Sequence, residues 1–164
     1  MTKRLLKKYG AQLGENINFK GGIIIDNATK DKDSTNDYRN IIIGNRSYIG
    51  RRVFFDIPNR IVIEDEALIS AGVSIFTHAE CGNRFMSNYF PMKTGSVKIG
   101  KRSWVGANVI ILSGVKIGEN CVVAAGSVIN RSFGSNEVIA GIPARRIGDP
   151  MDFKKNIKMP EYDF

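Results

Sequence analysis

His78, in the stretch IFTHAE, is the only histidine among the 164 residues. An imidazole is the side chain whose charge changes closest to neutral pH, so a histidine is well suited to take a proton from a hydroxyl under ordinary conditions. A lone histidine can also be a surface residue without a task. His78 stands where a regular, isoleucine-rich pattern gives way to an irregular segment at 79–96. This position favours a chemical role, although the residue type alone does not decide it.

Cysteine and metal chemistry have weaker support. Cys81 lies three residues after His78, and a Cys–His pair is a known nucleophilic arrangement, which the sequence leaves open as a minor alternative. Cys121 falls at a position that we expect to face the core. A catalytic zinc site built on three histidines cannot be supplied by one histidine. We therefore expect no metal site.

The chain is basic, with 24 Lys and Arg against 16 Asp and Glu and a formal net charge of +8. The basic residues are spread along the chain, without a nucleic-acid module signature, so we expect a solvated surface or a small anionic ligand rather than nucleic acid. No apolar run approaches the ~18–20 residues of a membrane-spanning helix, and we expect no membrane span. Two cysteines in this length are typical of a reducing compartment, which predicts a cytoplasmic protein.

A repeat of six residues organises most of the sequence. The first position of each hexad carries Leu, Ile, Val or Phe, in groups of three: Leu13, Phe19, Ile25; Ile43, Ile49, Phe55; Ile63, Ile69, Ile75; Ile99, Val105, Ile111; Ile117, Val123, Ile129. The fifth position is often small or β-branched, and the second is often glycine, which we expect to permit tight corners. A sandwich or barrel would show longer and less regular turn spacing. A strict period of six instead predicts short strands joined by corners, with three hexads forming one turn of a triangular prism.

The repeats also predict the organisation of the chain. We expect an N-terminal segment at 1–12 with one short helical turn near 3–9, a repeat domain of about five turns at 13–148, and a tail at 149–164. Interruptions fall at 28–40, after Phe55 and at 79–96. The segment 79–96 is rich in aromatic residues and methionine, so we expect it to fold against a neighbouring subunit or to cover a cleft. His78, the fourth residue of its hexad, should point outward at the base of this segment.

The stretch VGANVIILSGVKIGENCVVAAGSVI, followed by VIAGIPARRI, resembles the C-terminal signature of the hexapeptide-repeat acyltransferases. The resemblance covers most of residues 13–148. It implies an all-β fold, a left-handed parallel β-helix of about five triangular coils with the long loop 79–96. It also implies a homotrimer with active sites between neighbouring prisms and an acyl-CoA donor, with acetyl-CoA as the expected co-substrate.

The resemblance assigns roles to particular residues on the acceptor side. IFTHAE is similar to the form found in sugar and polysaccharide O-acetyltransferases, so His78 corresponds to the general base that takes the proton of the acceptor hydroxyl. Asp56 stands where sugar-acetylating members often bind the acceptor, but it can equally be a turn aspartate before Pro58. The sequence leaves open whether Glu80 orients the imidazole.

The donor side follows from the same resemblance. Ala107 and Ala125 correspond to small residues whose backbone meets the pantetheine arm of the donor. Asn130 and Arg131 stand where the family usually shows Thr-Lys, and Asn130 is a departure from that pattern. Arg145 corresponds to a basic residue at the nucleotide end, and the arginines at 131 and 145 keep the positive charge that a 3′-phosphate attracts.

We therefore expect an acetyl-CoA-dependent O-acetyltransferase that acts on a hydroxyl of a saccharide, either a surface polysaccharide or its precursor. One alternative is acetylation of a drug hydroxyl, as in the streptogramin-type members, although their NGANH-like context is absent. Another is a non-enzymatic prism that serves as a scaffold. The acceptor itself, and the choice of acetyl over another acyl group, cannot be read from the sequence.

Overall fold

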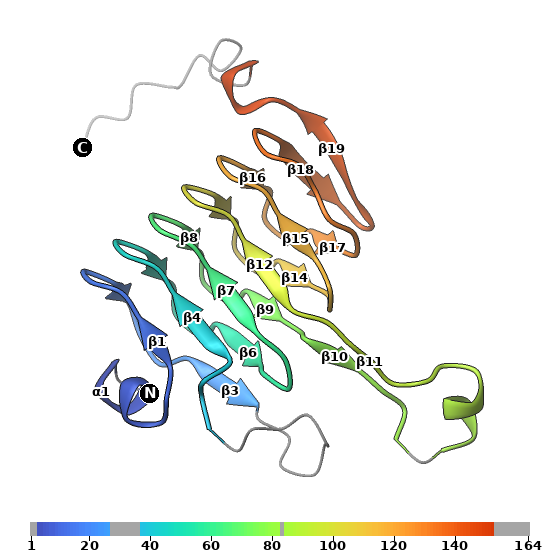
Figure 1. Cartoon of the computed structure of the whole chain (residues 1–164). Helices are drawn as coiled ribbons and strands as arrows, with labels where there is room; N and C mark the ends of the chain where they lie inside the picture. The colour runs from blue at the N-terminus through green and yellow to red at the C-terminus, as the bar shows by residue number, and fades with distance from the viewer. Residues whose placement is uncertain (1–2, 27–36, 83, 153–164) are drawn as a thin grey trace.

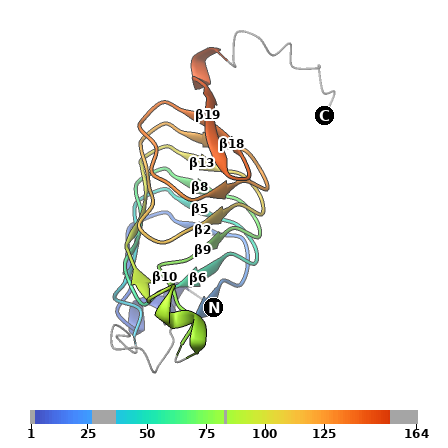
Figure 2. The same cartoon turned by 90° about the vertical axis from the view of Figure 1, so that its right-hand side faces the viewer.

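The protein is built from three sheets of short parallel strands, and a computed structural model describes it over residues 3–26, 37–82 and 84–152. The chain passes through the first, second and third sheets in turn and then returns to the first, beside its earlier strand (Figure 1). Seen from the side, the turns lie one above another (Figure 2). The predicted all-β fold with stacked parallel strands is confirmed.

The strands are two to five residues long. The first sheet contains β1 (Gln12–Leu13), β4 (Ile41–Ile43), β7 (Ile61–Ile63), β12 (Val97–Ile99) and β15 (Lys116–Ile117). The second contains β2 (Asn18–Phe19), β5 (Tyr48–Ile49), β8 (Leu68–Ile69), β13 (Trp104–Val105), β16 (Val122–Val123), β18 (Val138–Gly141) and β19 (Ala144–Gly148). The third contains β3 (Ile24–Asp26), β6 (Phe54–Asp56), β9 (Ser74–Ile75), β14 (Ile110–Ile111) and β17 (Val128–Ile129). Successive strands pair in parallel, except for the antiparallel β18–β19 pair at the end of the second sheet.

The core is a column of side chains from the first and fifth positions of the hexads. From Ile43 to Ile129 every first position is at most 1% exposed, and the fifth positions, such as Val53 and Cys121, are equally buried. Leu13, Phe19 and Ile25 of the first turn are only partly buried because no turn precedes them. Helix α1 (Lys3–Lys8), which lies in the range predicted for a helical turn, buries Leu6 against this end of the column. Each turn therefore depends on its neighbours for the burial of its apolar residues.

The corners between sheets are formed by the fourth residue of each hexad. Arg46, Arg52 and Asn108 adopt left-handed backbone angles, with φ of 53°, 56° and 56°. The second-position glycines have another role, because a Cβ on Gly44 would lie 2.6 Å from the backbone nitrogen of Asp65 in the next turn. The expected clash of a side chain at these positions is therefore present, and its source is the backbone of the next turn. These glycines allow stacked turns to approach each other closely.

The segment 79–96 forms an arm that projects away from the stacked turns (Figure 1). It leaves the end of the third sheet as β10 (His78–Ala79), carries the 3₁₀ helix η1 (Phe85–Asn88) near its tip, and returns as β11 (Lys93–Thr94), antiparallel to β10. Five large apolar side chains of the arm are exposed: Phe85, Met86, Tyr89, Phe90 and Met92. The arm thus leaves the turns of its own chain uncovered. The interruption predicted at 28–40 and the tail at 149–164 lie largely outside the described residues.

Candidate active site

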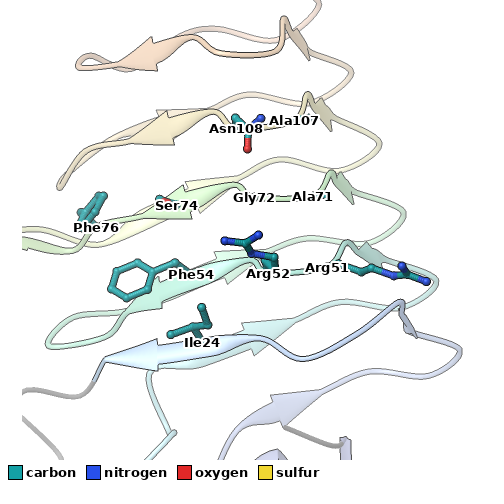
Figure 3. Close-up of a pocket in the computed structure, with 10 residues that line it drawn as sticks. All are labelled: Ile24, Arg51, Arg52, Phe54, Ala71, Gly72, Ser74, Phe76, Ala107 and Asn108. Carbon is teal, nitrogen blue, oxygen red and sulfur yellow. The ribbon is translucent and has the colours of Figure 1, made fainter.

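The outer face of the third sheet carries a pocket of about 700 Å³ (Figure 3). Phe54 of β6 pairs in register with Ser74 of β9, and both side chains face outward together with that of Phe76. The pocket extends to the corner between the second and third sheets, where Arg52 and Ala107 line it. The same two chain segments continue past the pocket to the other edge of the third sheet.

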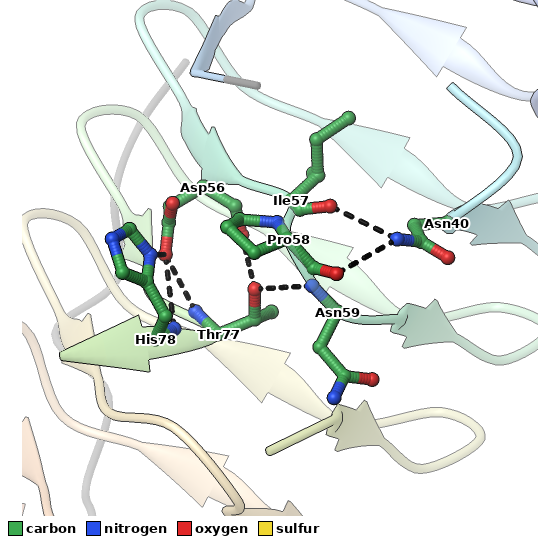
Figure 4. Close-up of polar contacts among 7 residues, drawn as sticks. All are labelled: Asn40, Asp56, Ile57, Pro58, Asn59, Thr77 and His78. Atoms are coloured by element: carbon green, nitrogen blue, oxygen red, sulfur yellow. Dashed lines mark hydrogen bonds and ion pairs between the residues drawn. The ribbon is translucent and has the colours of Figure 1, made fainter. Parts of the chain in front are cut away.

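His78 and Asp56 form a hydrogen-bonded pair at that other edge (Figure 4). The imidazole Nδ1 lies 2.8 Å from Asp56 Oδ2, and the same oxygen accepts the backbone N–H groups of Thr77 and His78 at 2.8 and 3.1 Å. Asp56 is 1% exposed, and the side chain of His78 is 17% exposed. A carboxylate oxygen accepts hydrogen bonds, so the pair places the ring proton on Nδ1. Nε2 is then the nitrogen that can accept a proton.

The strand register explains why these two residues meet. Phe55 of β6 pairs with Ile75 of β9, a spacing of twenty residues, so Asp56 lies beside Phe76 and within reach of the backbone at Thr77 and His78. The carboxylate sits beneath the point where the chain leaves the third sheet for the arm. Asp56 Oδ1 is buried and has no hydrogen-bond partner among the described residues.

A second layer of hydrogen bonds fixes the backbone around Asp56. Thr77 is fully buried. Its hydroxyl donates to the Asp56 carbonyl at 2.9 Å and accepts the backbone N–H of Asn59 at 2.9 Å. The Asn40 amide donates to the carbonyls of Ile57 and Pro58 at 3.0 and 3.2 Å (Figure 4). The short insertion after Phe55 is thus held rigidly against the site.

One expectation about this pair is corrected, and one open question is answered. His78 does not point outward from a corner, because the hexad pattern ends before it and its backbone enters β10, where it pairs with Thr94. Its imidazole lies over Asp56 instead. Glu80, considered as the residue that orients the imidazole, is exposed, and Asp56 occupies that position. The sequence contained the signal in the twenty-residue offset between the two turns, which brings Asp56 close to His78.

The predicted donor residues extend from the edge of the pocket, which Ala107 lines, toward the C-terminal turns. Ala107 and Ala125 occupy the same corner on successive turns, where the N–H of the residue after Ala125 donates to the Ala107 carbonyl at 2.8 Å. Asn130 and Arg131 follow β17 at the far edge of the third sheet, and both are exposed. Arg145 lies on β19, beyond the last parallel strand. The structure therefore places these residues along one stretch of the stack but on different elements.

The two arginines differ from their neighbours in their partners. The Arg131 guanidinium lies 5.2 Å from the centre of the Phe133 ring. Neither Arg131 nor Arg145 pairs with a carboxylate of the described residues, whereas Arg146 lies 3.9 Å from Glu137. The Arg145 guanidinium donates to the Ala144 carbonyl at 2.8 Å. Neither exposed guanidinium group is neutralised by a carboxylate of the described residues, so both can meet an anion at the C-terminal end of the stack.

The remaining candidates are placed as follows. Cys121 lies in the core as expected, and burial raises the pKa of its thiol. Cys81 lies on the arm and makes no described contact with His78. Trp104 is exposed on the second sheet and donates to the Ser70 hydroxyl at 3.1 Å. Within the described ranges no three His, Cys, Asp or Glu side chains gather as metal ligands, and no helix there is long and apolar enough to cross a membrane.

Comparison with known families and proteins agrees with this architecture. The sequence model of the bacterial transferase hexapeptide family, described as six repeats, matches residues 96–131. A second model, the hexapeptide repeat of succinyl-transferase, matches residues 40–77. The two matched regions flank the arm, and between them they include most of the regular turns.

Individual relatives point in the same direction. The galactoside O-acetyltransferase of Escherichia coli is 29% identical over 123 residues, which cover 75% of this chain and 61% of that protein. The crystal structure of a maltose O-acetyltransferase from Clostridium difficile is 29% identical, with a TM-score of 0.73 over 88% of this chain and 72% of that chain. A galactoside acetyltransferase in complex with coenzyme A is 26% identical, with a TM-score of 0.80 over 99% of this chain and 76% of that chain.

The fold and these matches define a hexapeptide-repeat protein of the bacterial transferase type. Residues 40–77 and 96–131 carry hexapeptide repeats of the transferase type, which confirms the resemblance that the repeats and the C-terminal signature predicted. It spans about three fifths of the length of the curated galactoside O-acetyltransferase that it matches.

Proposed function

We propose that this protein is an acetyl-CoA-dependent O-acetyltransferase that acts on a hydroxyl group of a saccharide. The observation that carries the proposal is the His78–Asp56 pair, in which a buried carboxylate holds Nδ1 of a half-buried imidazole at 2.8 Å. A scaffold protein has no need of a buried aspartate aimed at a histidine. The names of the relatives, galactoside and maltose O-acetyltransferases, support the same substrate class.

The reaction assigned to the pair is a direct acetyl transfer. An alcohol is a weak nucleophile at neutral pH, and removal of its proton as the new bond forms accelerates the attack by ~10²–10⁴. His78 accepts the hydroxyl proton at Nε2 while the oxygen attacks the thioester carbonyl carbon. The imidazolium then returns that proton to the departing sulfur, and the ester product is left. Asp56 holds the ring and stabilises its positive charge between these two events.

The residues on the corner after the pocket fit the donor. Ala107 and Ala125 have side chains of a single methyl group, so an extended pantetheine arm can lie close to the backbone along this corner. Bound there, acetyl-CoA supplies the thioester, and the three-dimensional similarity to a coenzyme A complex supports this placement. Arg131 and Arg145, with Asn130 beside them, are positioned beyond these alanines to meet the nucleotide end.

The donor assignment predicts selective loss of 3′-phosphate binding. Arg145→Ala and Arg131→Ala should each weaken the binding of coenzyme A by at least about tenfold, because a charge-assisted hydrogen bond is typically worth ~1.5–3 kcal/mol. The affinity for dephospho-coenzyme A should fall much less. Calorimetric titration of both ligands measures the difference.

Arg146→Ala provides the matched control, since Arg146 is adjacent in sequence and lies near Glu137. It should leave both affinities nearly unchanged. If the Arg145 and Arg131 substitutions weaken the binding of coenzyme A and of its dephospho form equally, these arginines do not contact the 3′-phosphate.

The full architecture is part of the proposal. We assign the repeat region, residues 13–148, to a left-handed parallel β-helix of about five triangular coils, flanked by the segments 1–12 and 149–164. We also propose a cytoplasmic homotrimer with the active sites between neighbouring prisms. The exposed aromatic and methionine side chains of the arm support an association of this kind, because apolar side chains gathered on a surface mark contacts with other molecules.

Light scattering at micromolar concentration should therefore give three times the chain mass. Phe85→Ser combined with Phe90→Ser removes two exposed aromatic rings from the arm and should shift the population toward smaller species without loss of the β spectrum. A wild-type protein that remains monomeric under these conditions would contradict the intersubunit site.

The activity is tested by the release of free thiol from acetyl-CoA in the presence of a panel of sugars and nucleotide sugars. A saccharide-dependent rate with formation of an O-acetyl ester is the expected result. Acetylation of streptogramin-type drug hydroxyls alone would favour that alternative, and a protein that binds no coenzyme A would be a scaffold.

A further inference from the structure

The two corners that flank the second sheet differ in whether their arginine side chains have partners. At the corner between the first and second sheets, Arg46 forms an ion pair with Glu66 of the next turn. Farther along the same corner, Arg102 donates to Asn120 at 2.8 Å and lies 3.5 Å from Glu119. At this corner, residues of the next turn supply hydrogen-bond or ion-pair partners for Arg46 and Arg102.

At the corner between the second and third sheets, the arginine side chains lack such partners. Arg52, in the same turn as Arg46, makes no side-chain hydrogen bond or ion pair with any residue in the described ranges. Its neighbour Arg51 donates only to a backbone carbonyl, that of Lys20, at 3.3 Å. Both residues line the pocket on the third sheet, and no carboxylate lines it with them. In Figure 3 the guanidinium of Arg52 lies over the pocket, whereas that of Arg51 points away from it. This concave site is therefore positively charged and lacks an internal counter-ion.

The space in front of Arg52 exists because small residues occupy the next turn. Ala71 and Gly72 stand at this corner, and Gly72 has the left-handed φ of 72° that a corner requires. A Cβ on Gly72 would lie 2.2 Å from Asn108 Oδ1 of the following turn. Figure 3 shows the guanidinium of Arg52 directed toward this gap. The pocket is thus a consequence of the corner sequence.

The pocket is connected to the proposed catalytic pair by the strands of the third sheet. Phe54 lies in the pocket, and Asp56 is two residues farther along β6; likewise Phe76 lies in the pocket and His78 two residues beyond it. Four residues lead from Arg52 to Asp56, and because the corner at Arg52 is not extended, a rise of ~3.3 Å per residue sets an upper limit of about 13 Å on their separation. This span is on the scale of a mono- or disaccharide. The aromatic rings of Phe54 and Phe76 lie between the two ends and offer apolar surface to a sugar ring.

We propose that the acceptor is an acidic saccharide whose carboxylate or phosphate group is bound by Arg52, with Arg51 beside it, while its reacting hydroxyl lies at His78. The inference rests on the proposed function and narrows its substrate class. A guanidinium group presents several N–H donors in one plane and binds planar or tetrahedral anions by paired hydrogen bonds. The net charge of +8 adds long-range attraction for such a substrate.

The donor is a poorer occupant for this end of the pocket. Its assigned residues begin at Ala107 and continue through Ala125 to Arg145, toward the C-terminal turns. Arg52 lies on the opposite side of Ala107, toward the N-terminal turns. The anion sites assigned to the two substrates therefore lie toward opposite ends of the stack.

Binding of matched probes tests the inference without relying on turnover. The probes are methyl β-D-glucuronide for a carboxylate, glucose 1-phosphate for a phosphate and methyl β-D-glucoside as the neutral reference, each titrated by calorimetry in the presence of coenzyme A. At least one anionic probe should bind about tenfold or more tightly than the glucoside. A preference for the glucuronide identifies a uronic-type acceptor, and a preference for the phosphate identifies a phosphorylated or nucleotide-linked one.

Two substitutions decide whether the preference belongs to this corner. Arg52→Asn removes the charge and keeps a residue type that the chain itself uses at left-handed corners, as at Asn108, and it should abolish the preference. Arg46→Asn removes the same charge from the other corner of the same turn and should preserve the preference for an anionic probe. Arg51→Gln should reduce that preference.

The other outcomes overturn the inference. These are equal binding of the three probes, no measurable binding of either anionic probe, a preference that survives Arg52→Asn, and a preference that Arg46→Asn also removes. If coenzyme A binds and neutral sugars are acetylated while no anion preference exists, the proposed function stands and this inference fails. If an anionic probe binds through Arg52 but coenzyme A does not bind, the proposed function fails and the anion site remains.

Discussion

Replacement of His78 by alanine is expected to lower kcat by about 10²–10⁴, the range that general-base catalysis contributes. No other histidine is present in the chain. Carboxylates are too weakly basic for this step, and lysines are mostly protonated at neutral pH. The binding site would still hold thioester and hydroxyl together, so a residual rate should persist. Steady-state kinetics with the identified acceptor, supported by single-turnover measurements, gives the effect on the chemical step.

The control for this substitution must allow for the position of the imidazole over Asp56. His78→Ala opens the buried carboxylate to water, so its effect on stability is measured by thermal unfolding. His78→Asn is the matched variant, because its side-chain amide can still donate to Asp56 but cannot act as a base. Both variants should bind coenzyme A as the wild type does and show similarly low kcat. Either variant retaining more than a tenth of the wild-type kcat would remove His78 from the role of base.

The regular part of the fold could be predicted from the sequence because one rule governs every turn. The first position of each hexad must be apolar to enter the core, and Ile43, Ile69 and Ile111 satisfy this in the same way. The preference for glycine at the second position could also be read from the sequence, but the contact that requires glycine there could not. The sequence cannot show that Gly44 meets the backbone of the next turn, because that contact depends on the spacing between turns.

The site was harder to predict because it lies where the repeat is broken. The short insertion after Phe55 and the departure of the arm after Thr77 both interrupt the hexads at the point where Asp56 contacts Thr77 and His78. The hexad pattern taken alone placed His78 at an outward corner. The proposed anion site was missed for a different reason: Arg46 and Arg52 occupy equivalent positions in adjacent hexads, and only their partners in three dimensions distinguish them.

Asp56 provides the second large effect that we expect, through the ring that it positions. Asp56→Asn keeps an oxygen that can accept the N–H groups of Thr77 and His78, and that of the imidazole Nδ1. Its amide NH2 group would occupy the buried place of Oδ1, which has no partner among the described residues, so we expect a loss of about 1–3 kcal/mol in the free energy of unfolding. The substitution removes the negative charge that stabilises the imidazolium formed during transfer. Because the site is buried, that charge is only weakly screened by water. We expect kcat to fall by about 10²–10³, with KM for acetyl-CoA nearly unchanged.

Thr77→Val separates this effect from a loss of structure. Thr77 belongs to the same buried network, donating to the Asp56 carbonyl and accepting from Asn59, but it does not contact the carboxylate through its side chain. Its replacement leaves the Asn59 N–H without an acceptor and should lower the free energy of unfolding by about 1–3 kcal/mol. It should change kcat only slightly. If Asp56→Asn lowers kcat no more than Thr77→Val does, Asp56 is a structural residue. A much larger loss of kcat at a similar loss of stability places its charge beside the reacting proton.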